Sequence, residues 1–161
     1  MSNKTLIVYY SLTGNTKFIA ESIKDEIDAD ILGIKPVKEL DSEKSSRFFW
    51  GGFQSTMKKK PKLEPFDINP LDYDLIILGT PVWAWNFTPP IRTFISKHDL
   101  SGKKVAIWSC SDGGTEKAIM KLKDELKGAD IITSLSLTTP LKKPEESKKK
   151  AIEWAKQVIT L

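Results

Sequence analysis

Cysteine and long hydrophobic runs are both scarce in this sequence. Cys110 is the single cysteine among 161 residues, so no disulfide can form within the chain. No apolar run approaches the roughly 20 residues that a membrane helix needs, so we expect no membrane insertion. The first residues carry a short apolar run but no small-residue cleavage site, which does not fit a signal peptide. We therefore expect a cytoplasmic protein.

Several sequence motifs of known phosphate-binding and nucleic-acid-binding proteins are missing as well. There is no G-x-x-x-x-G-K-[ST], which excludes a P-loop nucleotidase, and no G-x-G-x-x-G, so a Rossmann dinucleotide fold is unsupported. A receiver domain needs acidic residues after the first and third strands, and none stands there. A small cysteine phosphatase needs an arginine six residues after its nucleophile, where this chain has Glu116. The net charge is +4, but the lysine clusters carry no interleaved aromatic residues, so we expect no nucleic-acid binding.

The hydrophobic pattern of the sequence predicts one α/β domain spanning residues 1–161. Apolar strand-like runs occur at residues 5–10, 31–34, 75–78, 105–109 and 132–137. Segments with helical spacing begin near Asn15, after the two prolines at 89–90, near Ala118 and near Ala151. This alternation predicts a parallel sheet covered by helices on both sides. The run at 132–137 partly alternates apolar and polar residues, so we expect it at an edge of the sheet.

A cluster of neutral polar residues follows the first predicted strand. Because a helix is expected to start near its end, free backbone N–H groups and the positive end of the helix dipole point back into this loop. The glycine permits close approach of a ligand, and the hydroxyls and the amide can donate hydrogen bonds. One polar residue would suffice to cap the helix, so the cluster predicts a phosphate site without a cationic side chain. The predicted site residues are Ser11, Leu12, Thr13, Gly14, Asn15 and Thr16.

Two further loops follow the third and fourth predicted strands, where ligands bind in open α/β sheets. Trp83 and Trp85 are expected either to stack on a planar ring or to pack beneath their loop. Cys110 is expected to be a small apolar residue near the ligand and not a nucleophile, and the glycines after it offer backbone N–H groups to a ring edge. The candidate ligand-binding residues of these loops are Pro81, Val82, Trp83, Ala84, Trp85, Cys110, Ser111, Gly113 and Gly114.

The segments YYSLTGNTKFIA, GTPVWAWNFTPPIRTFI and SCSDGGTEKAI together resemble the flavodoxin family over nearly the whole chain. The resemblance implies a three-layer, doubly wound, five-stranded parallel sheet in strand order 2-1-3-4-5. It also implies noncovalently bound FMN, with the phosphate on residues 11–16. The isoalloxazine ring would then lie on the loops at residues 81–86 and 110–114.

The chain departs from typical electron-carrier flavodoxins in its charge and in its ring-binding loop. Those proteins are strongly acidic, whereas this one has a pI of about 9.0. They also often carry a glycine whose peptide flips to hydrogen-bond the reduced flavin, and here Ala84 stands between the tryptophans. Because a Cβ disfavours positive φ, we expect a flip at Ala84 to cost more than at glycine and to leave the neutral one-electron-reduced flavin less stable.

Three functions are compatible with the sequence. The first, which we expect, is an electron carrier between redox partner proteins, acting as a monomer or weak homodimer. The second is an FMN-dependent NAD(P)H oxidoreductase acting on a quinone or a similar small planar acceptor, and the third is an interaction module that has lost its flavin. The aromatic segment at residues 48–53 is expected either to pack on the sheet edge or to cap the flavin. His98 is expected to be exposed and without a catalytic role.

Overall fold

The computed structural model describes residues 4–39, 58–113 and 116–161. Five parallel strands form its sheet: β1 (Thr5–Tyr9), β2 (Asp30–Gly33), β3 (Leu75–Trp83), β5 (Lys104–Ser111) and β6 (Asp130–Thr138). They lie side by side in the order β2-β1-β3-β5-β6. Counted along the chain, this is the predicted order 2-1-3-4-5, so the doubly wound fold is confirmed. The half-buried strand β6 lies at an edge, as its alternating pattern indicated.

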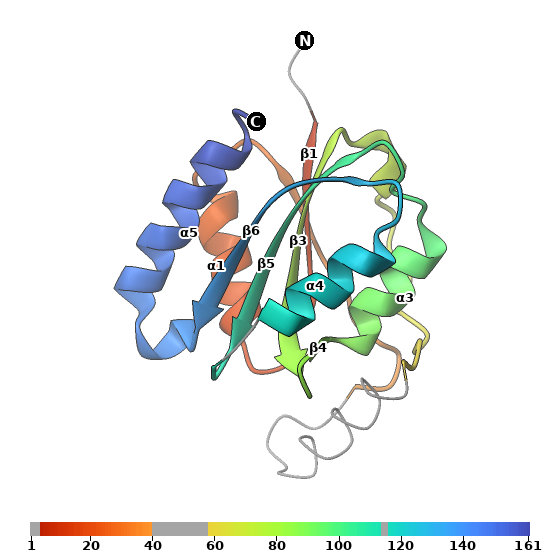
Figure 1. Ribbon diagram of the computed structural model, residues 1–161, viewed down its shortest axis with the longest axis horizontal. Helices are drawn as coiled ribbons and strands as arrows, with labels where there is room; N and C mark the ends of the chain where they lie inside the picture. Colours follow the sequence, from red (N-terminus) through yellow and green to blue (C-terminus); the bar gives the residue numbers. More distant parts are fainter. Residues whose placement is uncertain (1–3, 40–57, 114–115) are drawn as a thin grey trace.

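Helices cover both faces of the sheet and complete the three layers (Figure 1). One face carries α1 (Asn15–Lys24) and α5 (Pro144–Val158), and the other carries α3 (Pro89–Lys97) and α4 (Glu116–Glu125). Each face buries its own hydrophobic cluster, because the strand residues alternate between the two sides. Single 3-10 turns, η1 (Pro70–Asp72) and η2 (Pro140–Lys142), precede β3 and α5.

A sixth strand, β4 (Asn86–Phe87), pairs antiparallel with the end of β3 and was not predicted. Its base is pinned by the Thr88 backbone N–H, which donates to Thr80 Oγ1 over 3.1 Å. The guanidinium of the buried Arg92 lies 4.3 Å from the centre of the Phe87 ring and pairs with Glu125 at 3.2 Å. Helices α3 and α4 therefore hold this hairpin against the end of the sheet.

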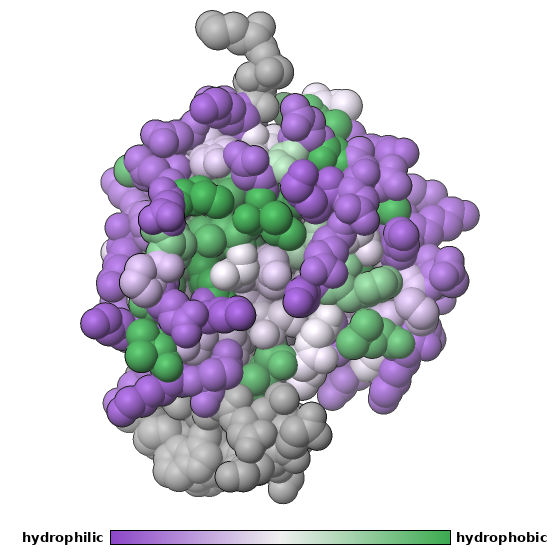
Figure 2. Space-filling model, turned by 180° about the vertical axis from the view of Figure 1, so that it is seen from behind, coloured by the Kyte–Doolittle hydropathy of each residue, from purple (hydrophilic) through white to green (hydrophobic). Residues whose placement is uncertain are grey.

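The connection from β2 to β3 is extended where the structure describes it. Pro36 and Leu63 form an isolated antiparallel bridge, and the Val37 N–H donates to the Lys62 carbonyl over 2.8 Å. On the face of the molecule turned away from the view of Figure 1, hydrophobic residues gather near the centre and hydrophilic ones surround them (Figure 2). The aromatic segment at 48–53 lies outside the described residues. None of the described helices is long and apolar enough to cross a membrane.

His98 differs from the expectation of an exposed side chain. It ends α3 half-buried, with Nδ1 2.9 Å from the Phe94 carbonyl oxygen and its ring stacked 4.8 Å from that of Phe94. Phe66, from the segment before η1, lies on the ring as well, at 5.9 Å. The imidazole is therefore part of the packing around α3.

Candidate functional site

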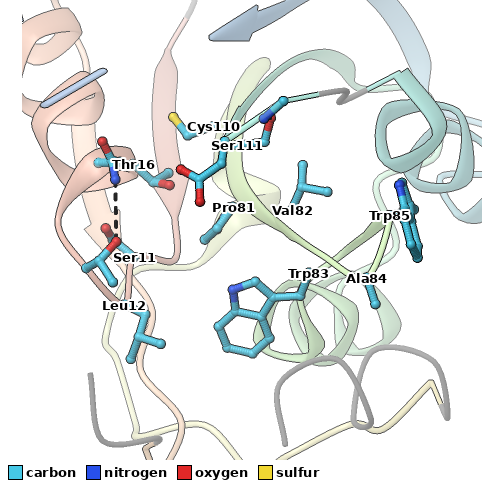
Figure 3. A pocket seen from close by; sticks show the side chains of 14 residues that line it. Ser11, Leu12, Thr16, Pro81, Val82, Trp83, Ala84, Trp85, Cys110 and Ser111 are labelled. Atoms are coloured by element: carbon cyan, nitrogen blue, oxygen red, sulfur yellow. Dashed lines mark hydrogen bonds between the residues drawn. The ribbon is translucent and has the colours of Figure 1, made fainter. Parts of the chain in front are cut away.

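A cavity of about 550 Å³ opens where β1, β3 and β5 end, within the size range of small-molecule sites (Figure 3). All the predicted site residues line it except two: Gly14 lies just outside, and Gly114 is outside the described residues. The sequence analysis missed Asp112, although it stands within one of the loops considered. The lining residues are Ser11, Leu12, Thr13, Asn15, Thr16, Pro81, Val82, Trp83, Ala84, Trp85, Cys110, Ser111, Asp112 and Gly113.

The first turn of α1 is open to a ligand. Gly14 precedes it with φ of 102°, a left-handed conformation that a Cβ would strain, and no side chain caps the helix. The Gly14 N–H donates to Ser11 Oγ over 3.2 Å, while the Phe18 N–H donates to the Gly14 carbonyl over 2.9 Å. The N–H groups between these two positions have no partner within the helix. Together with the helix dipole, they form a site suited to an anion.

The Thr16 hydroxyl adds an unpaired polar group to this site. Thr16 is 1 % exposed, and its Oγ1 makes no hydrogen bond to the rest of the described protein beyond a weak interaction with the Cys110 thiol. A buried hydroxyl without a strong partner costs free energy unless a ligand supplies one.

Burial raises the pKa of Cys110 to about 12, and its interactions with Thr16 and Trp108 offset the rise only in part. The thiol is therefore protonated at neutral pH and is no nucleophile.

The side chain of Asn15, whose amide was expected to donate a hydrogen bond to the ligand, also makes contacts within the protein. Its Oδ1 accepts the backbone N–H of Leu141 over 3.0 Å, and its Nδ2 makes a long 3.4 Å contact to Thr13 Oγ1. In the loop after β5, the Gly113 N–H donates to Ser111 Oγ over 3.1 Å, so that donor is also used within the protein. These contacts shape the two loops before any ligand arrives.

The other side of the cavity is a tight hairpin between β3 and β4. Its two central residues, Ala84 and Trp85, have φ of 50° and 58°, the positive values that a type I′ turn requires. Neither is glycine, so the turn holds two side chains in the left-handed region. The free-energy cost of positive φ that we expected for a peptide flip at Ala84 is therefore already incurred in this conformation.

The two tryptophans play different parts. Trp83 is half-buried and projects toward the centre of the cavity, whereas Trp85 lies on the far side of the hairpin and is 67 % exposed (Figure 3). Tyr10 supports Trp83 edge-on, with ring centres 5.7 Å apart and an interplanar angle of 85°. Burial and a 2.6 Å hydrogen bond donated to Glu39 raise the pKa of Tyr10, so it stays neutral. Trp83 is therefore the better placed aromatic surface for a planar ring.

Comparison with known proteins agrees with this geometry. The model of the family described as flavodoxin matches residues 4–154, so the chain belongs to the flavodoxin family. A flavoprotein of Lactobacillus acidophilus, solved in complex with FMN, is 28% identical with a TM-score of 0.75, covering 84% of this chain and 93% of that one. A Bacteroides uniformis protein named as a flavoprotein is 26% identical, with a TM-score of 0.79 and coverage of 97% and 99%.

Flavodoxin 2 of Bacillus cereus shares the fold at 23% identity, with a TM-score of 0.63 and coverage of 98% and 97%. The family match and the FMN complex of the Lactobacillus relative support the cofactor expected from the sequence, FMN. The residues present fit that cofactor, because an uncapped helix N-terminus and the unpaired Thr16 hydroxyl suit its phosphate. The half-buried Trp83 suits its ring.

Proposed function

We propose that this protein is an electron carrier that holds FMN noncovalently in the cavity and exchanges electrons with redox partner proteins. The buried, unpaired Thr16 hydroxyl beside the uncapped start of α1 is the observation that carries the proposal. In this proposal the phosphate lies beside this hydroxyl, with the hydroxyls of Ser11 and Thr13 alongside. The ring then lies against Trp83 and the loop after β5. FMN supplies the electron-transfer chemistry, and the protein supplies binding, orientation and electrostatics.

The side chains around the cavity favour a carrier over an enzyme with acid–base chemistry. Among the described lining residues, Asp112 is the only carboxylate and no histidine or lysine is present. Cys110 is held protonated by burial. His98 packs among aromatic rings at the C-terminus of α3. A carrier needs an accessible flavin edge and no proton-transferring side chain, and this lining meets that need.

The alternative is an FMN-dependent NAD(P)H oxidoreductase acting on a quinone or similar acceptor. The observation that favours it is the exposed indole of Trp85 at the cavity rim, a surface on which a second planar molecule could stack. In that case the flavin would be reduced by the nicotinamide directly. The two functions therefore differ in what reduces the bound flavin.

An anaerobic reduction assay tests both proposals. The protein is reconstituted with FMN, its flavin absorption band is recorded, and NADH or NADPH is added without any other protein. We expect the band to persist until a flavodoxin reductase is supplied and then to bleach. Rapid bleaching by the nicotinamide alone would establish the oxidoreductase instead. Absence of a flavin band after reconstitution would overturn the assignment of FMN.

A further inference from the structure

The phosphate loop and the loop after β5 are both tied to one further segment, whose link with the site was not predicted from the sequence. The connection between β6 and α5, residues 139–141, is called the clasp below. At its start the Thr139 N–H donates to the Ser111 carbonyl over 2.8 Å, in the loop after β5. At its end the Leu141 N–H donates to Asn15 Oδ1 over 3.0 Å, in the phosphate loop. The clasp therefore bridges the phosphate loop and the loop after β5, two of the three loops that line the cavity.

The clasp is stiff for its length. Thr139 has φ of 41°, in the left-handed region that a β-branched residue rarely adopts. Pro140 is buried and fixes the next φ, and the Lys142 N–H closes the turn onto the Thr139 carbonyl over 2.9 Å. The side chain of Leu141 covers Gly14, where a Cβ would lie 3.5 Å from Leu141 Cδ1. A strained residue persists only where its surroundings hold it, and here the Ser111 carbonyl and the turn that follows hold Thr139 in place.

The contact with Leu141 decides what Asn15 does at the start of α1. Gly14 holds the N-cap position of α1, and Asn15 is the first residue of the helix. Here its Oδ1 is taken by the clasp, and α1 has no side-chain cap. The Asn15 side chain is thereby fixed beside the N–H groups of the first turn and the Thr16 hydroxyl, which remain available to a ligand.

We propose that the clasp makes the site specific for phosphorylated flavin, by fixing the Asn15 side chain and keeping the phosphate loop in its binding shape. This inference rests on the proposed function, since it concerns how the same cavity selects FMN. Asn15 and Pro140 act as positioning residues in it. Riboflavin has the ring but no phosphate, so it needs the hairpin and the loop after β5 and not the contact between Leu141 and Asn15 at the phosphate loop.

The test compares the dissociation constants of FMN and riboflavin for three variants. Asn15→Ala removes the acceptor of the Leu141 N–H, and Pro140→Gly loosens the clasp without changing any residue of the phosphate loop. Asn69→Ala is the matched control, because Asn69 Oδ1 likewise accepts a backbone N–H, that of Leu71 in η1, over 3.1 Å. Asn69 does not line the cavity. Far-ultraviolet circular dichroism verifies that each variant is folded.

We expect Asn15→Ala and Pro140→Gly to raise the dissociation constant of FMN by about tenfold or more, which corresponds to the loss of one hydrogen bond. Both variants should change riboflavin binding little. Asn69→Ala should change neither. In the protein without flavin, the Leu141 amide should exchange its hydrogen faster in Asn15→Ala than in the unaltered chain.

Other outcomes overturn the proposal. An equal loss of FMN and riboflavin binding would show that the clasp only maintains the fold. A loss of FMN binding in Asn15→Ala but not in Pro140→Gly would show that Asn15 acts directly on the phosphate. If the unaltered protein binds riboflavin as tightly as FMN, the cavity does not select phosphate and the clasp has no such role. Failure of the FMN assignment looks different, because the unaltered protein would then bind neither flavin, and failure of the carrier role would appear in the anaerobic reduction assay and not in these dissociation constants.

Discussion

Replacing Thr16 by valine should have opposite effects on flavin binding and on the stability of the flavin-free protein. The Thr16 side chain is 1 % exposed and its hydroxyl lacks a strong partner, so valine keeps its shape and removes a poorly satisfied group. Leaving such a group buried costs about 1–3 kcal/mol, which the variant no longer incurs. We therefore expect the flavin-free variant to be as stable as the unaltered protein or more so, in urea unfolding followed by circular dichroism.

The same substitution removes a hydrogen bond to the phosphate. A hydrogen bond to a charged group contributes about 1.5–3 kcal/mol, which corresponds to a rise of about 10- to 150-fold in the dissociation constant of FMN. Fluorescence titration of FMN measures this change directly. Riboflavin binding should stay nearly the same, because riboflavin has no phosphate to accept this hydrogen bond.

Thr93→Val is the matched control for this experiment. Thr93 is as buried as Thr16, but its Oγ1 donates to the Pro61 carbonyl over 2.7 Å. Valine there leaves that carbonyl without its donor, so stability should fall by about 1–3 kcal/mol while folded protein binds FMN normally. The reasoning is refuted if Thr16→Val destabilises the flavin-free protein as much as Thr93→Val does, or if it leaves the FMN dissociation constant unchanged.

Three further outcomes follow from the fold and the charge. Ala84→Gly should increase the free energy of unfolding by about 1 kcal/mol and so raise the urea midpoint, because glycine adopts positive φ without strain. A lower midpoint would contradict the turn geometry. Gly79→Ala should cost about 3 kcal/mol in the same assay, because its Cβ would overlap the Trp108 indole; a neutral effect would show that the indole can move. The net charge of +4 should attract the ferricyanide anion, so its oxidation of the reduced, FMN-loaded protein should slow as the salt concentration rises, as measured by stopped flow. Faster oxidation at higher salt would indicate a negative potential around the flavin.

The parts of this protein that could be predicted from the sequence are those that depend on residues close together in the chain. The apolar run before Ser11 and the hydroxyls after it lie next to each other in the chain, so strand, loop and helix start were all visible. The resemblance to flavodoxins then supplied the strand order, which the structure confirms. The prolines at 89–90 begin α3 as expected, and Gly128, with φ of 81°, follows the end of α4.

The features that were missed depend on contacts or backbone angles that the sequence does not display. Strand β4 has two residues, and its turn holds positive φ at alanine and tryptophan, where a hairpin signal would show asparagine or glycine. His98 is half-buried because Phe66, far away in the chain, lies on its ring. The role of Asn15 was missed for the same reason, because its partner Leu141 lies 126 positions further along.

The separation between Asn15 and Leu141 has a consequence for the order of events during synthesis. The phosphate loop is translated well before the segment that braces it, because Leu141 lies 126 positions after Asn15 in the chain. A nascent polypeptide can therefore pair β1 with β3 long before the cradle around Thr16 reaches the form described above. Tight capture of the cofactor is thereby coupled to translation of residues 139–141, so truncated products that lack α5 and the turn before it should bind FMN more weakly than the longer chain.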